Sequence, residues 1–269
     1  MAFGWETEVP HGLLLIGLGL AGALVGSFLN VVIHRLPEMM RRRDAENEGD
    51  SDTTRYDLAL PPSSCPHCGH LIRAHENIPL LSYLLLRGRC SGCRQPIALR
   101  YPLVELLGIT APLLLAGLRP IGPEMLSICI FAWFSIAIAA IDINEFLVPD
   151  DLSLPLLWLG LLIAATGLGP GAVNAIYGAV AGYMLFLAIH SIGRKLARRP
   201  VLGMGDVKLA AAIGAWVGWS GLPEALFIGC ALGSIIGIGL IVLKRSQRGH
   251  PIPFGPFLVS GALAWLGLH

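Results

Sequence analysis

Two aspartates that lie far apart in the chain, Asp142 and Asp206, have the surroundings expected of a catalytic pair. Asp206 follows Gly203 and Gly205, and glycines beside an acid let the backbone of an extended peptide approach closely. Asp142 ends an apolar run, where a carboxylate opposes the dipole of the preceding helix and needs another reason for its presence. If the two carboxyl groups meet, one can hold a proton while the other takes a proton from water, which is the chemistry of an aspartic protease.

Cysteines form a second group with ligand spacing, in two C-x-x-C pairs: Cys65, Cys68, Cys90 and Cys93. Two such pairs at this separation are typical of a tetrahedral zinc site, because each pair presents two thiolates from one tight turn. Gly69, Gly88 and Gly92 beside the pairs are expected to supply the turn conformations. Four thiolates leave no open position on the metal, so the predicted zinc ion is structural and does not hydrolyse a substrate.

The elements that must position these groups are membrane helices. Of the 269 residues, 54% are hydrophobic and only 14% are charged, against about a quarter charged in soluble domains. The first apolar run, 13–33, contains no charge and is long enough to cross a hydrocarbon layer of ~30 Å. The segment before it has no Lys or Arg, so we expect a first span and not a cleaved signal peptide. Further apolar runs predict an all-α polytopic protein with about eight transmembrane helices, at 101–118, 124–141, 152–168, 173–192, 205–220, 222–243 and 252–268.

The basic residues support this arrangement of spans. Seventeen of the 19 Lys and Arg fall on one side of the membrane if the spans alternate, in 34–100, 193–200 and 244–250. Because Lys and Arg accumulate on the cytoplasmic side, both chain ends should face the opposite side. Disulfides are disfavoured in the cytoplasm, which leaves zinc as the expected role of the four cysteines. The same arrangement places Asp142 and Asp206 at the cytoplasmic membrane face.

The chain is therefore expected to consist of three parts. Residues 1–33 form the first transmembrane helix, and residues 34–100 form a small cytoplasmic insertion with the four-cysteine zinc site. Residues 101–269 form a membrane domain of seven helices that carries both aspartates.

Several long stretches resemble the bacterial prepilin leader peptidases, which are G-x-G-D-type intramembrane aspartic proteases of type IV pilus and type II secretion systems. The similar stretches run nearly end to end: GSFLNVVIHRLP (26–37), CPHCGHLIRAHENIPLLSYLLLRGRCSGC (65–93), RYPLVELL (100–107), IDINEFLVPDDLSLPLLWLGL (141–161), GMGDVKLAAAIGAWVGW (203–219) and PIPFGPFL (251–258). The resemblance implies Asp142 and Asp206 as the catalytic pair and the four cysteines as zinc ligands. Gly203, Gly205 and Lys208 belong to the motif that carries the second aspartate.

The resemblance also implies two activities. The enzyme would cleave the short basic leader of a prepilin or pseudopilin after a glycine, and would then methylate the new N-terminal residue with S-adenosylmethionine. Its expected location is the bacterial inner membrane, with lipid around it, both termini in the periplasm, the active site at the cytoplasmic face, and no nucleic acid as partner. The sequence does not locate a site for S-adenosylmethionine.

The loop at 142–151 is acidic and, unlike the other loops on its face, contains no basic residue. Helix capping accounts for at least one of Asp150 and Asp151. We expect these two residues and Glu145 to attract the basic leader.

One function from another class fits the same residues. A transporter or proton channel with a regulatory zinc domain would use Asp142, Glu105 and Asp206 as relay sites, because ionisable groups at membrane depth are costly and functional. Transporters of this kind contain paired repeats, and the chain shows no convincing repeat. A third possibility is a zinc-binding membrane scaffold without catalysis, which would leave Gly203, Gly205, Asp206 and the acidic loop unexplained. Substitution of Asp206 by Asn tests it, because a peptidase then loses turnover and keeps its fold, whereas a scaffold keeps its function.

Overall fold

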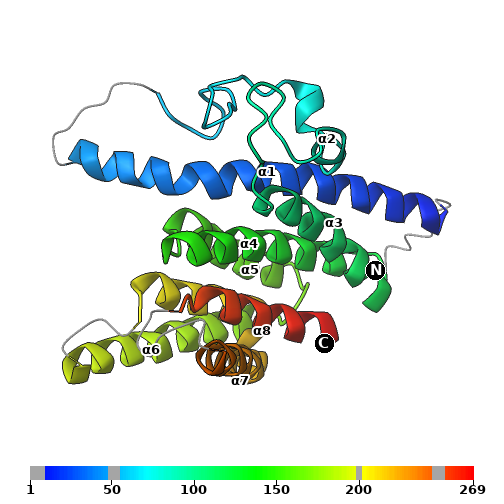
Figure 1. Cartoon of the computed structure of the whole chain (residues 1–269). Coiled ribbons are helices and arrows are strands. Elements are labelled where there is room, and N and C mark those ends of the chain that lie inside the picture. Colours follow the sequence, from blue (N-terminus) through cyan, green and yellow to red (C-terminus); the bar gives the residue numbers. More distant parts are fainter. Residues whose placement is uncertain (1–9, 48–54, 198–201, 244–251) are drawn as a thin grey trace. The chain divides into compact units, whose positions relative to one another are not determined.

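The computed structural model describes residues 10–47, 55–197, 202–243 and 252–269, and these residues form an all-helical structure (Figure 1). The predicted fold class is confirmed in this respect. The chain divides into two compact units, Met1–Pro120 and Ile121–His269. The four cysteines lie in the first unit, and both aspartates lie in the second.

The first unit is built on two helices, α1 (His11–Asn47) and α3 (Arg100–Leu118), which pack closely through glycines. A Cβ atom on Gly26 would lie 2.9 Å from the Cα atom of Glu105, and one on Gly108 would lie 2.8 Å from the Cα atom of Gly26. The side chain of Asn30 donates a hydrogen bond of 3.0 Å to the carbonyl of Tyr101. Small residues and interhelical hydrogen bonds of this kind hold helices together where both face lipid.

Helix α1 continues beyond its apolar part as a charged helix that ends at Asn47. Arg35 is buried, and its guanidinium donates to the carbonyls of Asp57 (2.9 Å) and Pro61 (2.6 Å). These bonds hold the start of the insertion against α1. The insertion itself contains the 3₁₀ helix η1 (Ala74–Asn77) and the short helix α2 (Leu81–Leu85).

The second unit contains five helices: α4 (Pro123–Glu145), α5 (Asp150–Ala165), α6 (Ala172–Ala197), α7 (Met204–Val242) and α8 (Gly255–Leu268). Helix α7 is interrupted at Gly218, whose φ of 72° and ψ of 175° are not helical. The part before Gly218 is the core of the unit, because nearly all of its residues from Val207 onward are buried. It packs on α6 where Gly214 and Gly178 meet, with no room for a Cβ atom on either residue.

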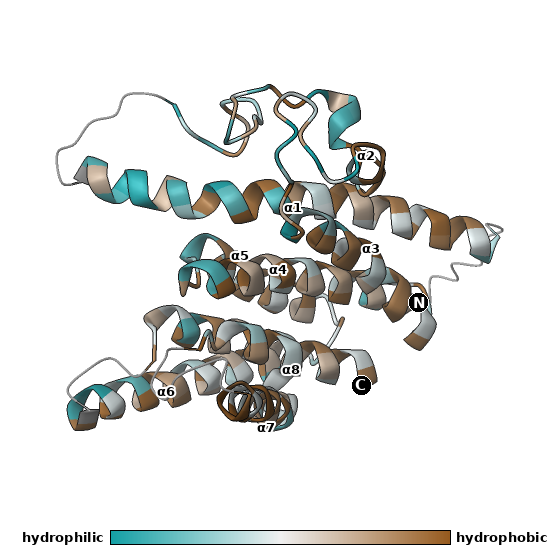
Figure 2. Ribbon diagram, in the orientation of Figure 1, coloured by the Kyte–Doolittle hydropathy of each residue, from teal (hydrophilic) through white to brown (hydrophobic). Residues whose placement is uncertain are grey.

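Five helices in the described part of the chain are long and apolar enough to cross a membrane, namely α1, α3, α4, α6 and α7, and α8 is a shorter apolar helix. Figure 2 shows that hydrophobic residues cover most of these helices and that hydrophilic residues gather at the C-terminal ends of α1 and α6. The chain thus has the helices of a multi-pass membrane protein. The interruption at Gly218 lies close to the predicted boundary between the sixth and seventh spans.

Candidate active site

Asp142 lies in the last turn of α4, and its side chain is buried, with only 4% of the residue exposed. Helix α4 ends because Phe146 adopts a left-handed conformation (φ 53°) and donates its N–H to the Asp142 carbonyl at 2.9 Å. The Asp142 carboxylate accepts a hydrogen bond of 2.8 Å from the backbone N–H of Gly255, the first residue of α8. The positive end of α8 therefore faces a carboxylate that would otherwise oppose the dipole of α4.

Asp206 lies in the first turn of α7 and is partly exposed. Its Oδ2 atom accepts a hydrogen bond of 3.2 Å from the backbone N–H of Gly203, so that the carboxylate caps its own helix. Gly205 packs against Val148, and a Cβ atom on Gly205 would lie 2.7 Å from the Val148 carbonyl oxygen. Only glycine lets the start of α7 approach the chain that follows α4 this closely.

The two aspartates are close enough that the charge of Asp142 acts on Asp206. The chain after Asp142 and the chain before Asp206 meet at the contact between Val148 and Gly205. A site of this kind has one buried carboxyl group with a fixed backbone donor and one that is open to the surface. Such a pair can share one proton and use the partly exposed member, Asp206, to reach a substrate.

An ion pair also joins the start of α7 to the chain that follows α4. The Lys208 ammonium contacts the Asp150 carboxylate, so the second turn of α7 is tied to the first turn of α5. The Asp150 carboxylate is thus engaged within the chain, and the nearby residues Glu145 and Asp151 are exposed. Deeper in the unit, the Trp216 indole donates to the Leu156 carbonyl at 2.8 Å and again joins α7 to α5.

The contact between Gly255 and Asp142 was not anticipated from the sequence. A Cβ atom on Gly255 would lie 2.8 Å from Asp142 Oδ2, so the position requires glycine as well as an N–H donor. The only sequence signal was a glycine between Phe254 and Pro256 at the start of the last apolar run. Lys208 and Asp150 were both singled out in the sequence, but their pairing was not predicted.

The four cysteines form one cluster in the insertion, and their sulfur atoms all lie within 4.8 Å of one another. The two pairs have the same local structure, because the residue after each second cysteine, Gly69 or Arg94, is left-handed (φ 70° and 61°). Gly88 is also left-handed, as expected. Gly92 is not left-handed, and glycine is needed there because a Cβ atom would lie only 3.1 Å from the side chain of His70. The backbone N–H groups of His67 and Cys68 hold the pKa of the Cys65 thiol at about 7.

The cluster has the dimensions of a zinc site. Sulfur atoms at about 2.3 Å from a tetrahedral Zn²⁺ are about 3.8 Å apart, and Cys65 and Cys93 are separated by 3.9 Å. A neighbouring network joins the two pairs, because His70 contacts Ser91 at 3.0 Å and Glu76 at 3.2 Å. Both contacts use the same ring nitrogen of His70, so the three residues are not arranged as a serine protease triad.

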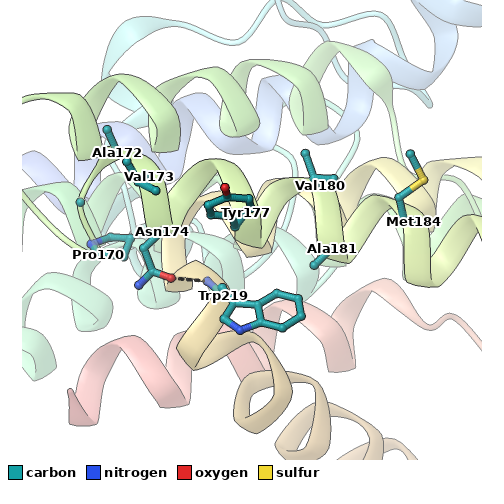
Figure 3. Close-up of a pocket in the computed structure, with 10 residues that line it drawn as sticks. Pro170, Ala172, Val173, Asn174, Tyr177, Val180, Ala181, Met184 and Trp219 are labelled. Atoms are coloured by element: carbon teal, nitrogen blue, oxygen red, sulfur yellow. Dashed lines mark hydrogen bonds between the residues drawn. The ribbon is translucent and has the colours of Figure 1, made fainter.

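A groove of about 810 Å³ lies along the first half of α6 (Figure 3). Its lining is almost entirely apolar and includes Tyr177, Met184 and Trp219. The Asn174 side chain accepts a hydrogen bond of 2.9 Å from the Trp219 N–H, which satisfies a donor freed by the interruption at Gly218. Asp206 is separated from Gly218 by about 18 Å of helix, so the groove is not part of the aspartate site.

Comparisons with known proteins give a consistent result for both units. Residues 20–117 match the profile described as Bacterial Peptidase A24 N-terminal domain, and residues 129–238 match the Type IV leader peptidase family. Several relatives carry the name prepilin leader peptidase/N-methyltransferase, and three of them illustrate the similarity. The relative from Aeromonas hydrophila is 44% identical over 96% of this chain and 93% of its own length. Those from Burkholderia pseudomallei and Pseudomonas aeruginosa are both 42% identical, over 96% and 92% of this chain and 86% and 88% of their own lengths. No solved structure gave a significant match.

Proposed function

Because the chain belongs to the type IV leader peptidase family, we propose that it removes the leader peptide of a type IV prepilin or a type II secretion pseudopilin and methylates the new N-terminus. The similarity covers nearly the whole chain and both units, which favours an enzyme with both activities over a transporter or proton channel. The bond cleaved follows a glycine, and the methyl donor is S-adenosylmethionine.

Cleavage is assigned to Asp142 and Asp206. One carboxylate takes a proton from water, which attacks the scissile carbonyl, and the other carboxyl group gives a proton to the leaving amine. Each role contributes a factor on the order of 10²–10⁴ in rate. The observation that carries this assignment is the placement of both acids at one end of the second unit, within electrostatic reach of each other.

The substrate meets this site at the cytoplasmic face of the inner membrane. We propose eight spans, in which α7 supplies two spans that join at Gly218 and in which the shorter helices α5 and α8 also cross. Both termini then face the periplasm, and the ends of α4 and α7 that carry the aspartates face the cytoplasm, where most Lys and Arg lie. The scissile bond of a prepilin lies at the junction between its basic leader and its apolar helix. This junction lies at the cytoplasmic membrane face, at the same depth as the two aspartates. The partners of the enzyme are this substrate and the surrounding lipid, and not nucleic acid.

The exposed acids beside the site, Glu145 and Asp151, attract the basic leader, and Asp150 adds to this field while it holds Lys208. Charge reversal at Glu145 or Asp151 should therefore slow cleavage of a substrate with a Lys- and Arg-rich leader. A substrate with a neutralised leader should be cleaved at an unchanged rate. Equal slowing of both substrates would contradict this role.

The four cysteines hold a structural zinc ion, which fits the distance between their sulfur atoms. When bound, zinc fixes the fold of the insertion. We assign this part to presentation of the new amine for methylation. Substitution of Cys65 or Cys90 by Ser should then impair methylation more than cleavage, and equal loss of both would indicate a role in the overall fold instead.

The decisive experiment uses purified protein and a prepilin-like substrate, with product mass read for leader removal and for an added methyl group. Asp142→Ala and Asp206→Asn should both abolish cleavage, and Asp44→Asn on the exposed end of α1 serves as a matched control. A substrate supplied without its leader separates the activities, because both aspartate variants should still methylate it. Cleavage at the normal rate by either variant would refute the catalytic assignment.

A further inference from the structure

The short helix α2 and the residues before it expose an unusual amount of apolar surface for a segment outside the membrane spans. Leu84 and Leu85 are 71% and 72% exposed, and Ile78 and Leu81 are 42% and 48% exposed. We call these four residues the leucine patch. Figure 2 shows α2 as a strongly hydrophobic element of the first unit. Apolar side chains gathered in one segment indicate a binding surface more often than chance exposure.

The leucine patch is fixed to the beginning of a membrane helix. The backbone N–H of Leu80 donates a hydrogen bond of 2.8 Å to the Glu105 carboxylate on α3. Leu80 has a positive φ (59°) with a ψ of −43° where it makes this approach, and such a backbone conformation costs energy for a residue with a side chain. The patch is therefore positioned at the level of Glu105 and cannot lie freely in the solvent.

That level corresponds to the boundary of the bilayer. Glu105 lies about 7.5 Å along α3 from its first residue, Arg100, at ~1.5 Å per residue. Apolar faces of interfacial helices are buried about 5–10 Å into the region between headgroups and acyl chains. The exposed side chains of Leu103 and Leu106 on α3 lie in the same turns as Glu105, so the lipid-facing surface of α3 includes this depth.

The charges around the patch match an anionic membrane surface. Arg87 and Arg89 follow α2 directly and are exposed, and the segment 77–99 contains no Asp or Glu. Arginines at the edge of an apolar patch reach the phosphate groups of anionic lipids while the apolar side chains insert below them.

From these observations, we propose that the leucine patch inserts into the interfacial layer of the membrane, with an anionic lipid surface as its partner. The insertion then has three attachments to the membrane: α1, α3 and α2. In the chain, one cysteine pair lies between α1 and α2 and the other between α2 and α3. The four-cysteine cluster is therefore held at the lipid surface. The leaflet concerned is the cytoplasmic one if the topology proposed above is correct. The contact of the leucine patch with lipid does not depend on that topology.

Photocrosslinking in full-length protein tests the proposal. The photoreactive residue p-benzoyl-phenylalanine is placed at Leu84 or at Leu85, and the protein is reconstituted in nanodiscs that contain phosphatidylglycerol. The control position is Asp44, which is exposed and lies about 16 Å beyond the apolar run of α1 at ~1.5 Å per residue. After irradiation, mass spectrometry should find phospholipid adducts at Leu84 and Leu85 at least five-fold above the control.

Two results would overturn the proposal. The first is crosslinking of Leu84 and Leu85 mainly to peptides of this chain or of another protein, and the second is a lipid yield equal to that of the control. Zinc content and monodispersity confirm that each variant is folded.

The role of anionic lipid is tested separately. The combined variant Arg87→Gln and Arg89→Gln, or replacement of phosphatidylglycerol by phosphatidylcholine, should lower the lipid yield at least two-fold. An unchanged yield would refute the role of anionic lipid. Because the readout is a lipid adduct, it does not depend on peptidase or methyltransferase activity.

Discussion

The contact between Gly255 and Asp142 gives the sharpest prediction, because the change that disrupts it is a single methyl group. In Gly255→Ala the new Cβ atom would lie 2.8 Å from Asp142 Oδ2 and 3.4 Å from Val148 Cγ2. Ordinary contact begins near 3.4 Å, so the carboxylate or the start of α8 must move by roughly 0.6 Å. Such a shift within packed helices costs about 1–3 kcal/mol of stability.

The effect on cleavage should be larger than the effect on the fold. A displacement of about 1 Å in a catalytic group lowers the rate by a factor on the order of 10². We therefore expect kcat for leader removal to fall on the order of 10-fold to 10²-fold. Methylation of a substrate that is supplied without its leader should continue at the normal rate, because this reaction does not use Asp142.

The assay compares both reactions of each variant in the same detergent or nanodisc preparation. The matched control is Gly239→Ala in α7, where the added Cβ atom has no neighbour within 4 Å and kcat should be unchanged. Full cleavage by Gly255→Ala would refute the reasoning, since the position of the carboxylate would then be irrelevant. Parallel loss of cleavage and methylation would show a general folding defect and would refute it equally.

Three further predictions concern other parts of the chain. Lys208→Met and Asp150→Asn should each slow cleavage, and a double-mutant cycle should give a coupling of about 1 kcal/mol in stability because the pair is partly exposed; full additivity would contradict a direct contact. Gly218→Ala should destabilise the second unit by about 1–3 kcal/mol, measured by thermal unfolding, since the left-handed backbone and the neighbouring atoms both oppose a Cβ atom. The Asp57 carboxyl should titrate near 2, because the Leu60 N–H, the Arg55 guanidinium and the Ala59 N–H lower its pKa to about 2 from 3.8. Since the folded pKa is the lower one, this turn contributes its stability above pH 3.8 and loses it as the pH falls toward 2; a midpoint near 4 in carboxyl NMR would contradict these bonds.

Local spacing made the four-cysteine cluster and the apolar helices predictable. The two C-x-x-C pairs carry their geometry in a few adjacent residues, and the structure gathers all four sulfur atoms. The helical class followed from the length of the apolar runs. The two pairs still differ in one residue. The left-handed position after the second cysteine is a glycine in the first pair, Gly69, but an arginine in the second pair, Arg94, where the turn tolerates some backbone strain.

The charged segment that begins at Glu38 continues α1 as far as Asn47. Its residues are good helix formers, and Glu38 pairs with Arg41 and Arg42 one turn later, which stabilises an exposed helix. Polarity alone does not distinguish such a helix from a coil.

The partners of the aspartates were less predictable for a physical reason. Gly255 acts through its backbone N–H, which every residue except proline possesses, so no residue type marks the donor. The sequence predicted a boundary between two spans close to the interruption of α7 but not its residue, because Gly218 is one of 33 glycines and only its surroundings give it a positive φ. Both features depend on contacts between segments that are distant in the sequence.

The interruption at Gly218 also couples parts of the second unit mechanically. Before this residue, α7 is fixed to α5 and α6 by Trp216 and Gly214, whereas after it the helix packs on α8, where Gly229 lies against Phe257. The Trp219 N–H just after the interruption is held by Asn174 of α6, and α8 packs on α4 as well as on α7. The change of direction at Gly218 is therefore fastened on both sides, so the Gly255 amide that meets Asp142 stands on the same packed frame as the first part of α7, which carries Asp206.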